Sequence, residues 1–166
     1  VNNLKSFSDE TTTGLRKAFI QCAAIETFLL WKKYKEDKKK DAGGEQKSSD
    51  VEAQNQLESG EIPEEFKRQM YYTFGDYRDI CLGTDISSDS NIKGISQKVK
   101  KIVQYKNSET HEQNITPKTW WETNKNDIWQ GILCALPHSD QLKNKPEYKT
   151  PPEEFAKTPQ FLRWFI

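Results

Sequence analysis

The stretch Pro63–Gly83 constrains the fold of this chain most strongly, because its apolar residues recur at steps of four, four, three and four. That spacing places them on one face of an α-helix. They are Phe66, Met70, Phe74, Tyr77 and Cys81. Pro63 suits the first helical position, and Gly83 is typical of a helix end. Gly75, inside the helix, costs about 1 kcal/mol relative to alanine, which indicates a packing reason for its presence.

Two further long stretches show helical patterns. Leu15–Lys40 carries two apolar stripes, which predict burial on more than one side of the helix. The stripes are Leu15, Ala18, Cys22, Ile25 and Leu29, and Ile20, Ala24, Phe28 and Trp31. Pro117–Leu136 follows Thr116, a good N-cap residue, and has a broad apolar face rich in tryptophan. With a short amphipathic helix around 95–103 and no strand alternation, the sequence predicts an all-α helical bundle.

The connecting segments are long and polar. Asp41–Gly60 is rich in Gly, Ser, Gln and Glu, so we expect a loop or a disordered segment there. The chain has 25 basic and 25 acidic residues, and its aromatic residues lie at core spacing, which argues against a nucleic-acid-binding surface. No apolar run approaches the roughly 20 residues of a membrane span. Because the sequence ends within an apolar run at Ile166, we expect a piece of a larger protein.

A group of charges interrupts the apolar face of the central stretch. Asp76, Arg78 and Asp79 lie among aromatic residues. They are open to three interpretations: a structural salt-bridge network, a binding or catalytic carboxylate cluster, or simple exposure to solvent. We expect a structural role, in which at least one carboxylate pairs with an arginine, either Arg78 or Arg163, because a buried charge needs a partner.

The end of the first long helix is basic. Lysines near a helix C-terminus are favoured by the helix dipole, and a solvated face is one interpretation of them. The other is a binding site for a polyanion of the heparin or chondroitin type. The residues concerned are Lys32, Lys33, Lys35, Lys38, Lys39 and Lys40.

The sequence shows no constellation of catalytic or metal-binding type. His111 and His138 lie in polar segments, and no phosphate loop, nucleophile elbow or HExxH motif is present. Cys22, Cys81 and Cys134 lie on apolar helical faces without zinc-type spacing, so from the residues alone they are either buried thiols or partners in disulfides. We expect no enzymatic activity, no metal and no cofactor.

Four segments carry a family resemblance. FKRQMYYTFGDYRDICLG (66–83) resembles the central signature of Duffy-binding-like (DBL) domains, in particular those of the variant erythrocyte membrane proteins of the malaria parasite Plasmodium falciparum. FIQCAAIETFLLWKKY (19–34), PKTWWETNKNDIWQGILCAL (117–136) and FAKTPQFLRW (155–164) agree with the same family in the same order. The resemblance implies a helical, disulfide-bonded extracellular module.

The resemblance also implies a function in cell adhesion. Proteins of this family are similar to multidomain membrane antigens that are displayed on infected erythrocytes and that contribute to cytoadherence, antigenic variation and virulence. The implied partners are a host cell-surface receptor (an endothelial protein or a sulfated glycosaminoglycan), other domains of the same antigen, and antibodies. The alternative is a structural spacer domain of the same antigen with no ligand of its own.

Roles for individual residues follow from the same resemblance. It favours a disulfide between Cys81 and Cys134, with Cys22 paired outside this chain or free. The chain 1–166 is then part of a single DBL domain, mainly its central helical subdomain, and 150–166 begins the next subdomain. The residues expected to form the structural core are Trp31, Phe66, Phe74, Tyr77, Arg78, Asp79, Trp120, Trp121, Trp129, Arg163 and Trp164.

Overall fold

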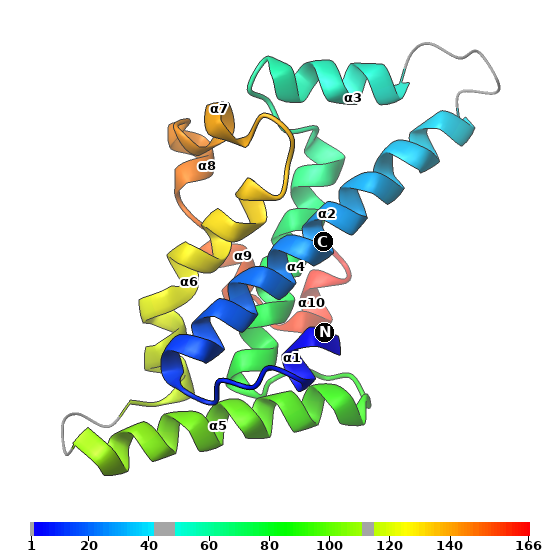
Figure 1. Ribbon diagram of the computed structural model, residues 1–166. Helices are drawn as coiled ribbons and strands as arrows, with labels where there is room; N and C mark the ends of the chain where they lie inside the picture. The colour runs from blue at the N-terminus through cyan, green and yellow to red at the C-terminus, as the bar shows by residue number, and fades with distance from the viewer. Residues whose placement is uncertain (1, 42–48, 111–114) are drawn as a thin grey trace.

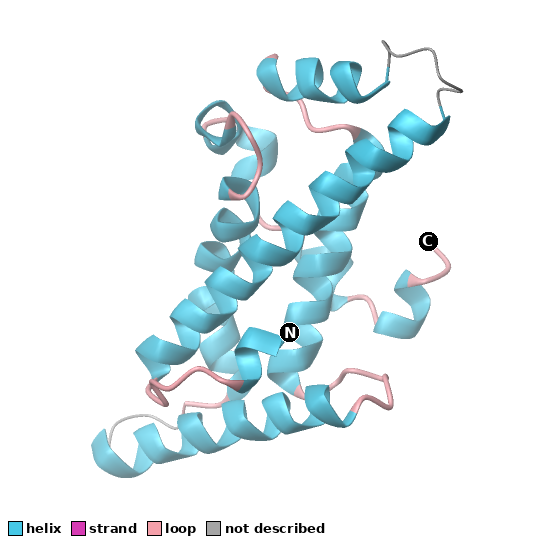
Figure 2. Ribbon diagram, turned by 45° about the vertical axis from the view of Figure 1, so that its right-hand side comes forward, coloured by secondary structure: helices cyan, strands magenta, loops and turns pink. Residues whose placement is uncertain are grey.

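The computed structural model describes residues 2–41, 49–110 and 115–166, and in this part of the chain the regular structure is helical, with no strand (Figure 2). The elements are α1 (Asn2–Lys5), α2 (Thr12–Asp41), α3 (Ser49–Glu58), α4 (Glu64–Leu82), α5 (Ser90–Thr110), α6 (Pro117–Cys134), α7 (Ser139–Lys143), α8 (Pro146–Lys149), α9 (Glu153–Lys157) and α10 (Gln160–Arg163). The all-α prediction is confirmed. No helix in the described ranges is long and apolar enough to cross a membrane.

Three helices, α2, α4 and α6, form the centre of the bundle (Figure 1). They confirm the three stretches expected from periodicity. Gly83 ends α4 in the left-handed conformation, with φ 73°, and its N–H donates to the carbonyl oxygen of Asp79. Pro63 precedes α4 as its N-cap instead of occupying the first helical position. Thr116 caps α6 as expected, because its side chain accepts a hydrogen bond from the Thr119 N–H.

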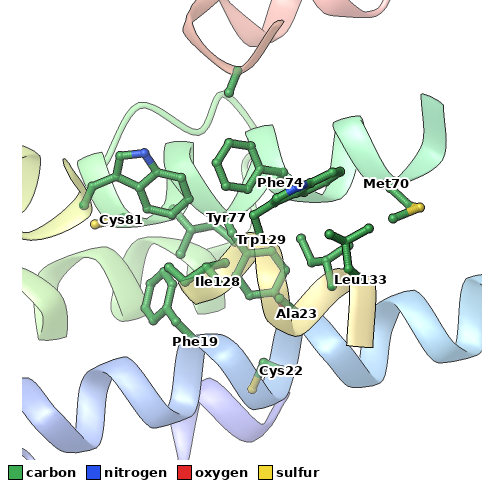
Figure 3. Close-up of a cluster of buried hydrophobic side chains, with 14 of the residues drawn as sticks. Phe19, Cys22, Ala23, Met70, Phe74, Tyr77, Cys81, Ile128, Trp129 and Leu133 are labelled. Carbon is green, nitrogen blue, oxygen red and sulfur yellow. The ribbon is translucent and has the colours of Figure 1, made fainter. Parts of the chain in front are cut away.

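Aromatic side chains fill the space between the three central helices (Figure 3). The Phe74 ring lies between two tryptophans, with centroid distances of 5.2 Å to Trp121 and 5.7 Å to Trp129. Phe19 of α2 packs edge-on against Tyr77 of α4. These rings are almost completely buried, so the apolar face of α4 has the function that its periodicity predicts.

The helices α3 and α5 lie at opposite ends of this core (Figure 1). The expectation of a loop over Asp41–Gly60 is wrong for Ser49–Glu58, which forms α3, while residues 42–48 lie outside the described part. Ala53 and Leu57, one helical turn apart, are buried in the core. Two apolar residues at this spacing are enough to dock a short helix, although they are too few to reveal it in composition.

The expectation that α2 is buried on more than one side is wrong. Residues such as Leu15, Cys22 and Trp31 face the core. The outer side of the helix instead exposes Ile25, Phe28 and Leu29, by 46%, 55% and 57%. The apolar surface of α2 is therefore wider than the area that α4 and α6 cover.

Candidate functional site

The charges of α4 form a buried network with the C-terminal segment. Arg163 is completely buried, and its Nη2 lies 2.5 Å from Asp79 Oδ2 and 3.2 Å from Asp76 Oδ1. Its Nη1 donates to the carbonyl oxygens of Thr158 at 2.7 Å and of Ala156 at 3.3 Å. The guanidinium is thus held by two carboxylates and two carbonyls, so the predicted pairing of an α4 carboxylate with an arginine is present, and the arginine is Arg163.

Close packing of Arg163 explains why a glycine occupies position 75, although glycine is unfavourable inside a helix. A Cβ atom at this position would lie 3.0 Å from Cζ and 3.1 Å from Nε of Arg163. The missing side chain therefore lets the guanidinium approach the backbone of α4 closely enough to reach both carboxylates.

Gln160 adds further hydrogen bonds to the network, while Arg163 Nε is buried without a hydrogen-bond partner. Gln160 Nε2 donates to Asp85 at 2.9 Å and to Asp76 at 3.3 Å, and its Oε1 accepts from the Ile86 N–H. Burial raises the pKa of Asp76, and the hydrogen bond from Gln160 and the charge of Arg163 oppose that rise. Arg78 is half-buried and donates to the carbonyl oxygen of Ala156. These carboxylates serve to hold a neighbouring segment.

Most of the expected structural core is buried. Trp31, Phe66, Phe74, Tyr77, Asp79, Trp120, Trp121, Trp129 and Arg163 are each at most 4% exposed. The prediction that Trp164 belongs to the core is wrong, because 60% of this residue is exposed. It follows Arg163 directly, at the end of α10. Since Arg163 points into the network, the next residue points about 100° away from it around the helix axis, toward solvent.

The expected disulfide between Cys81 and Cys134 is wrong, since all three cysteines are free. Cys81 lies beside the start of α6, with its Sγ 3.5 Å from the carbonyl oxygen of Pro117. Cys134 is the last residue of that helix, about 25 Å further along its axis. Bonded cysteines have Cα atoms within about 7 Å, so this antiparallel pair of helices cannot form the bridge.

The thiols differ in their surroundings. Cys22 and Cys81 are buried, whereas Cys134 is exposed. Burial raises the pKa of the Cys81 thiol to about 12, and it also raises the pKa of Cys22. Both buried thiols are therefore protonated and unreactive at neutral pH.

The polyanion site predicted from sequence lies at the end of α2, on the surface. We call it the α2 lysine cluster, and it consists of Lys32, Lys33, Lys35, Lys38, Lys39 and Lys40. Lys32, Lys33, Lys39 and Lys40 are exposed. Lys38 Nζ lies 2.6 Å from Glu65 Oε2 at the start of α4, and its hydrogen bond lowers the pKa of that carboxyl. Lys35 Nζ lies 6.0 Å from the centre of the Trp31 ring, and Lys40 lies 3.9 Å from Asp37. Nearby carboxylates therefore neutralise part of the cluster.

Sequence reasoning missed the exposed apolar residues that precede this cluster on α2. Ile25, Phe28 and Leu29 belong to the two apolar stripes, and they lie one to two helical turns before Lys32. The width of the combined stripes was the available signal, because a helix that packs on one side buries only about a third of its surface.

The described residues contain no group of three or more His, Cys, Asp or Glu side chains that could hold a metal ion. His138 precedes α7 with a positive φ of 57°, and its Nε2 lies 3.6 Å from Glu58 Oε1. His111 lies outside the described residues.

In a comparison with known protein families, residues 1–163 match the Duffy binding domain. Searches of curated proteins and of solved structures gave no match. The matching family consists of non-catalytic adhesion domains, which generally bind host receptors and are typically extracellular parts of parasite surface proteins. Because the match covers nearly the whole helical chain, the protein belongs to the Duffy binding domain family, and the resemblance of its four sequence segments to that family is confirmed.

Proposed function

We propose that this chain is a host-receptor-binding module of a malaria-parasite variant surface antigen, which acts in the adhesion of infected erythrocytes. Membership of the Duffy binding domain family supports an adhesion function. The four segments that resemble the variant erythrocyte membrane proteins support the narrower origin. The proposed receptor is an endothelial protein or a sulfated glycosaminoglycan.

The observation that best supports a receptor site on this chain is the exposed apolar surface on the outer face of α2. Exposed Phe28 and Leu29 are followed by the exposed ends of Lys32 and Lys33. An aromatic anchor beside charged residues is the usual composition of a binding hot spot. The family motif residues of the core are buried and are not available for contact, so recognition has to use surface positions such as these.

The test measures binding of the chain to a panel of endothelial receptor proteins and sulfated glycosaminoglycans. Phe28→Ser should weaken the affinity for the protein receptor by roughly tenfold. Phe161→Ser is the matched control, because Phe161 is 56% exposed and Phe28 is 55% exposed. Equal effects of the two substitutions would show that the outer face of α2 is not the receptor site.

A structural spacer is the second candidate function, and the burial of the motif residues favours it. If their pattern reflects packing alone, the chain holds neighbouring domains in place and has no ligand. Failure of the wild-type chain to bind any receptor in the panel, while the intact antigen binds, would support the spacer function.

We also propose that the chain is mainly the central helical subdomain of one domain and that residues 150–166 begin the next one. The way in which the C-terminal segment packs supports this division, because its contacts with α4 are separate from the packing of α4 against α2 and α6. Arg163 and Gln160 of α10 bind the α4 aspartates, and Phe155 of α9 packs against Tyr71 and Tyr72. Limited proteolysis tests it: cleavage should start near 150, before it reaches α2 or α6.

A further inference from the structure

The segment that contains α9 and α10 lies along one side of α4 (Figure 1). We call residues 153–163 the C-terminal arm. The side of α4 that receives it carries Tyr72, Gly75, Asp76 and Asp79, which follow one another at steps of three, one and three residues. Residues at this spacing share one side of a helix, so they form one continuous strip. We call this strip the arm-binding face of α4.

Two widely spaced residues of the arm are bound to this face. The guanidinium of Arg163 lies 2.5 Å from Asp79 Oδ2 and 3.2 Å from Asp76 Oδ1. The carbonyl oxygen of the same arginine accepts a hydrogen bond from the Tyr72 hydroxyl. Near the start of the arm, the Phe155 ring packs edge-on against the Tyr72 ring, with 5.2 Å between the ring centres. Both ends of the arm are therefore held by the same helix.

The arm depends on this face for its own structure. The helix α9 has five residues and α10 has four, and helices of this length are not stable in water by themselves. Within the arm, Arg163 Nη1 donates to the carbonyl oxygens of Ala156 and Thr158. One guanidinium thus holds the arm together and attaches it to α4, so the arm keeps its shape against a face that offers the two carboxylates.

The chain is firmly anchored just before the arm begins. The hydroxyl of Tyr148 accepts a hydrogen bond from the Ile62 N–H at 2.9 Å, and its carbonyl oxygen accepts one from Trp129 Nε1 at 2.7 Å. Tyr148 is therefore fixed to the bundle through both its side chain and its backbone.

A short link joins this anchor to the arm. Thr150 has an extended backbone with ψ 130°, and the chain turns at Pro152, where ψ is 67°. The turn is closed by a hydrogen bond from the Glu153 N–H to the Pro151 carbonyl oxygen. Proline also adopts the extended polyproline conformation, with ψ about 145°. Opening this one turn would direct the arm away from its own α4 and leave the anchor in place.

We propose that the C-terminal arm binds the arm-binding face of a second copy of this chain, in a reciprocal exchange that joins two copies. The contacts that hold the arm in one chain re-form between the two copies. The exchanged pair therefore keeps the buried ion pairs, and it differs from the closed chain chiefly in the link and in the entropy of association. Because a link of three residues spans at most about 10 Å, the two arm-binding faces lie close to the two-fold axis.

The fit of the arm is the reason for assigning this face to a second copy. An unrelated protein would have to present an aromatic ring and an arginine at the separation of Phe155 and Arg163. It would also have to supply the carbonyl oxygens that complete the contacts of the guanidinium. A second copy presents all of these groups in the same arrangement. The inference is independent of the proposed receptor site, which lies on the outer face of α2.

The experiment mixes two full-length variants that are mismatched within one chain and matched between chains. Arg163→Met leaves Asp79 without its cation, and Asp79→Leu leaves Arg163 without its closest carboxylate. In an exchanged pair with one copy of each, one face regains the arginine and the aspartate, and the other joins the two introduced apolar side chains. The variants are unfolded in urea, mixed in equal amounts and refolded, and native mass spectrometry measures the dimers of each composition. Mixed dimers should form at a concentration about tenfold lower than wild-type dimers do.

The matched control mixes the wild type with the chain that carries both substitutions. Each of these chains is matched within itself, and exchange between them would create two mismatched faces. Mixed dimers should therefore be rarer than random pairing gives. A single variant that does not fold alone leaves the test valid, because its recovery on refolding with the other variant is the expected result.

Equal proportions of mixed dimers in the two mixtures would show that the arms are not exchanged. Mixtures that contain only monomers, or variants that stay unfolded after mixing, would also overturn the proposal. If the wild-type chain binds a receptor while both mixtures remain monomeric, this inference fails and the proposed receptor function stands.

Discussion

Two sides of the helix α4 make different kinds of contact: one packs against buried aromatic rings, and the other forms buried ion pairs. Toward α2 and α6 it presents Phe74 and Tyr77 to a layer of buried rings. Toward the C-terminal segment it presents Asp76 and Asp79 to the buried guanidinium of Arg163. The first side gains stability from apolar area, which tolerates small shifts in geometry. The second gains it only when every charged partner is in place, because an unpaired buried charge is costly.

The difference between these two sides shows how one helix can pack both against long helices and against a short segment. The aromatic side joins long helices whose shapes complement each other over many residues. The charged side joins α4 to short helices. Phe155 adds one ring contact with Tyr71 and Tyr72, and the hydrogen bonds of Arg163 set the orientation of the segment. Each side nevertheless contains one buried N–H group without a hydrogen-bond partner: Arg163 Nε on the charged side, and Nε1 of Trp31, which packs on Phe66, on the aromatic side.

The largest effect is expected from the aromatic side. Trp129→Ala should lower the free energy of unfolding by about 3–5 kcal/mol, because it removes a fully buried ring and leaves a cavity between α4 and α6. It also removes the hydrogen bond from Trp129 Nε1 to the carbonyl oxygen of Tyr148. Urea denaturation measures the change. Phe161→Ala, at an exposed position, should cost about 0.5 kcal/mol or less.

The charged side should respond nearly as strongly to the loss of one partner and much less to the loss of both. Arg163→Ala leaves Asp79 buried and unpaired and should cost about 3 kcal/mol or more. Arg163→Met combined with Asp79→Leu replaces the pair by apolar side chains and should recover most of that loss. A double variant as unstable as Arg163→Ala would show that this side also depends on the specific hydrogen bonds.

A smaller loss of stability is expected from a substitution at Gly75, where the Arg163 guanidinium lies against the backbone of α4. Gly75→Ala should gain about 1 kcal/mol from helix propensity. The new methyl group would lie 3.0 Å from Arg163 Cζ, and the guanidinium cannot retreat without lengthening its bonds to both aspartates. We expect a net destabilisation of about 1 kcal/mol. A net stabilisation in thermal melting would mean that the guanidinium moves freely, contrary to the packing described above.

The smallest effect is a dependence on pH. Because burial raises the pKa of Asp76 in the folded protein, folded Asp76 takes up a proton at a higher pH than unfolded Asp76 does. Its contribution to stability therefore increases as the pH falls through the raised value toward the ordinary 3.8. Asp76→Asn cannot titrate, so the wild type should gain stability relative to this variant over that range. The gain should be small, because 42% of the Asp76 side chain is exposed.

Denaturation curves of both proteins between pH 7 and the ordinary aspartate pKa measure this difference. A relative stability that is independent of pH would show that the charge of Arg163 offsets burial completely. A change in the opposite direction would show that Arg163 dominates.

Much of the fold could be predicted because periodicity is a local property. The apolar steps in α4 and the cap at Thr116 follow from residue types and spacing. The sequence also predicts that an α4 aspartate pairs with an arginine, but it leaves Arg78 and Arg163 as alternatives, and the structure shows Arg163. The helix α3 could not be predicted, because Ala53 and Leu57 stabilise it only once they are docked in the core. The composition of that segment shows its polar residues, but it does not show that Ala53 and Leu57 pack in the core.

The errors at the candidate sites share one cause, which is that a sequence pattern does not say which neighbour covers a residue. Cys81 and Cys134 both occupy core helices, yet their antiparallel arrangement puts them at opposite ends of α6. Phe28 continues an apolar stripe that α4 and α6 do not reach.

The position of Arg163 in the chain has a consequence for synthesis. Its partner Asp79 lies 84 residues earlier. At translation rates of about 5–20 residues per second, Arg163 is therefore made roughly 4–17 s after Asp79. During that interval α2, α4 and most of α6 are available to pack their rings, while the charged side of α4 still faces water. The nascent chain can therefore bury the apolar side of α4 first, and the charged side is completed only after Arg163, 84 residues beyond Asp79, has been made.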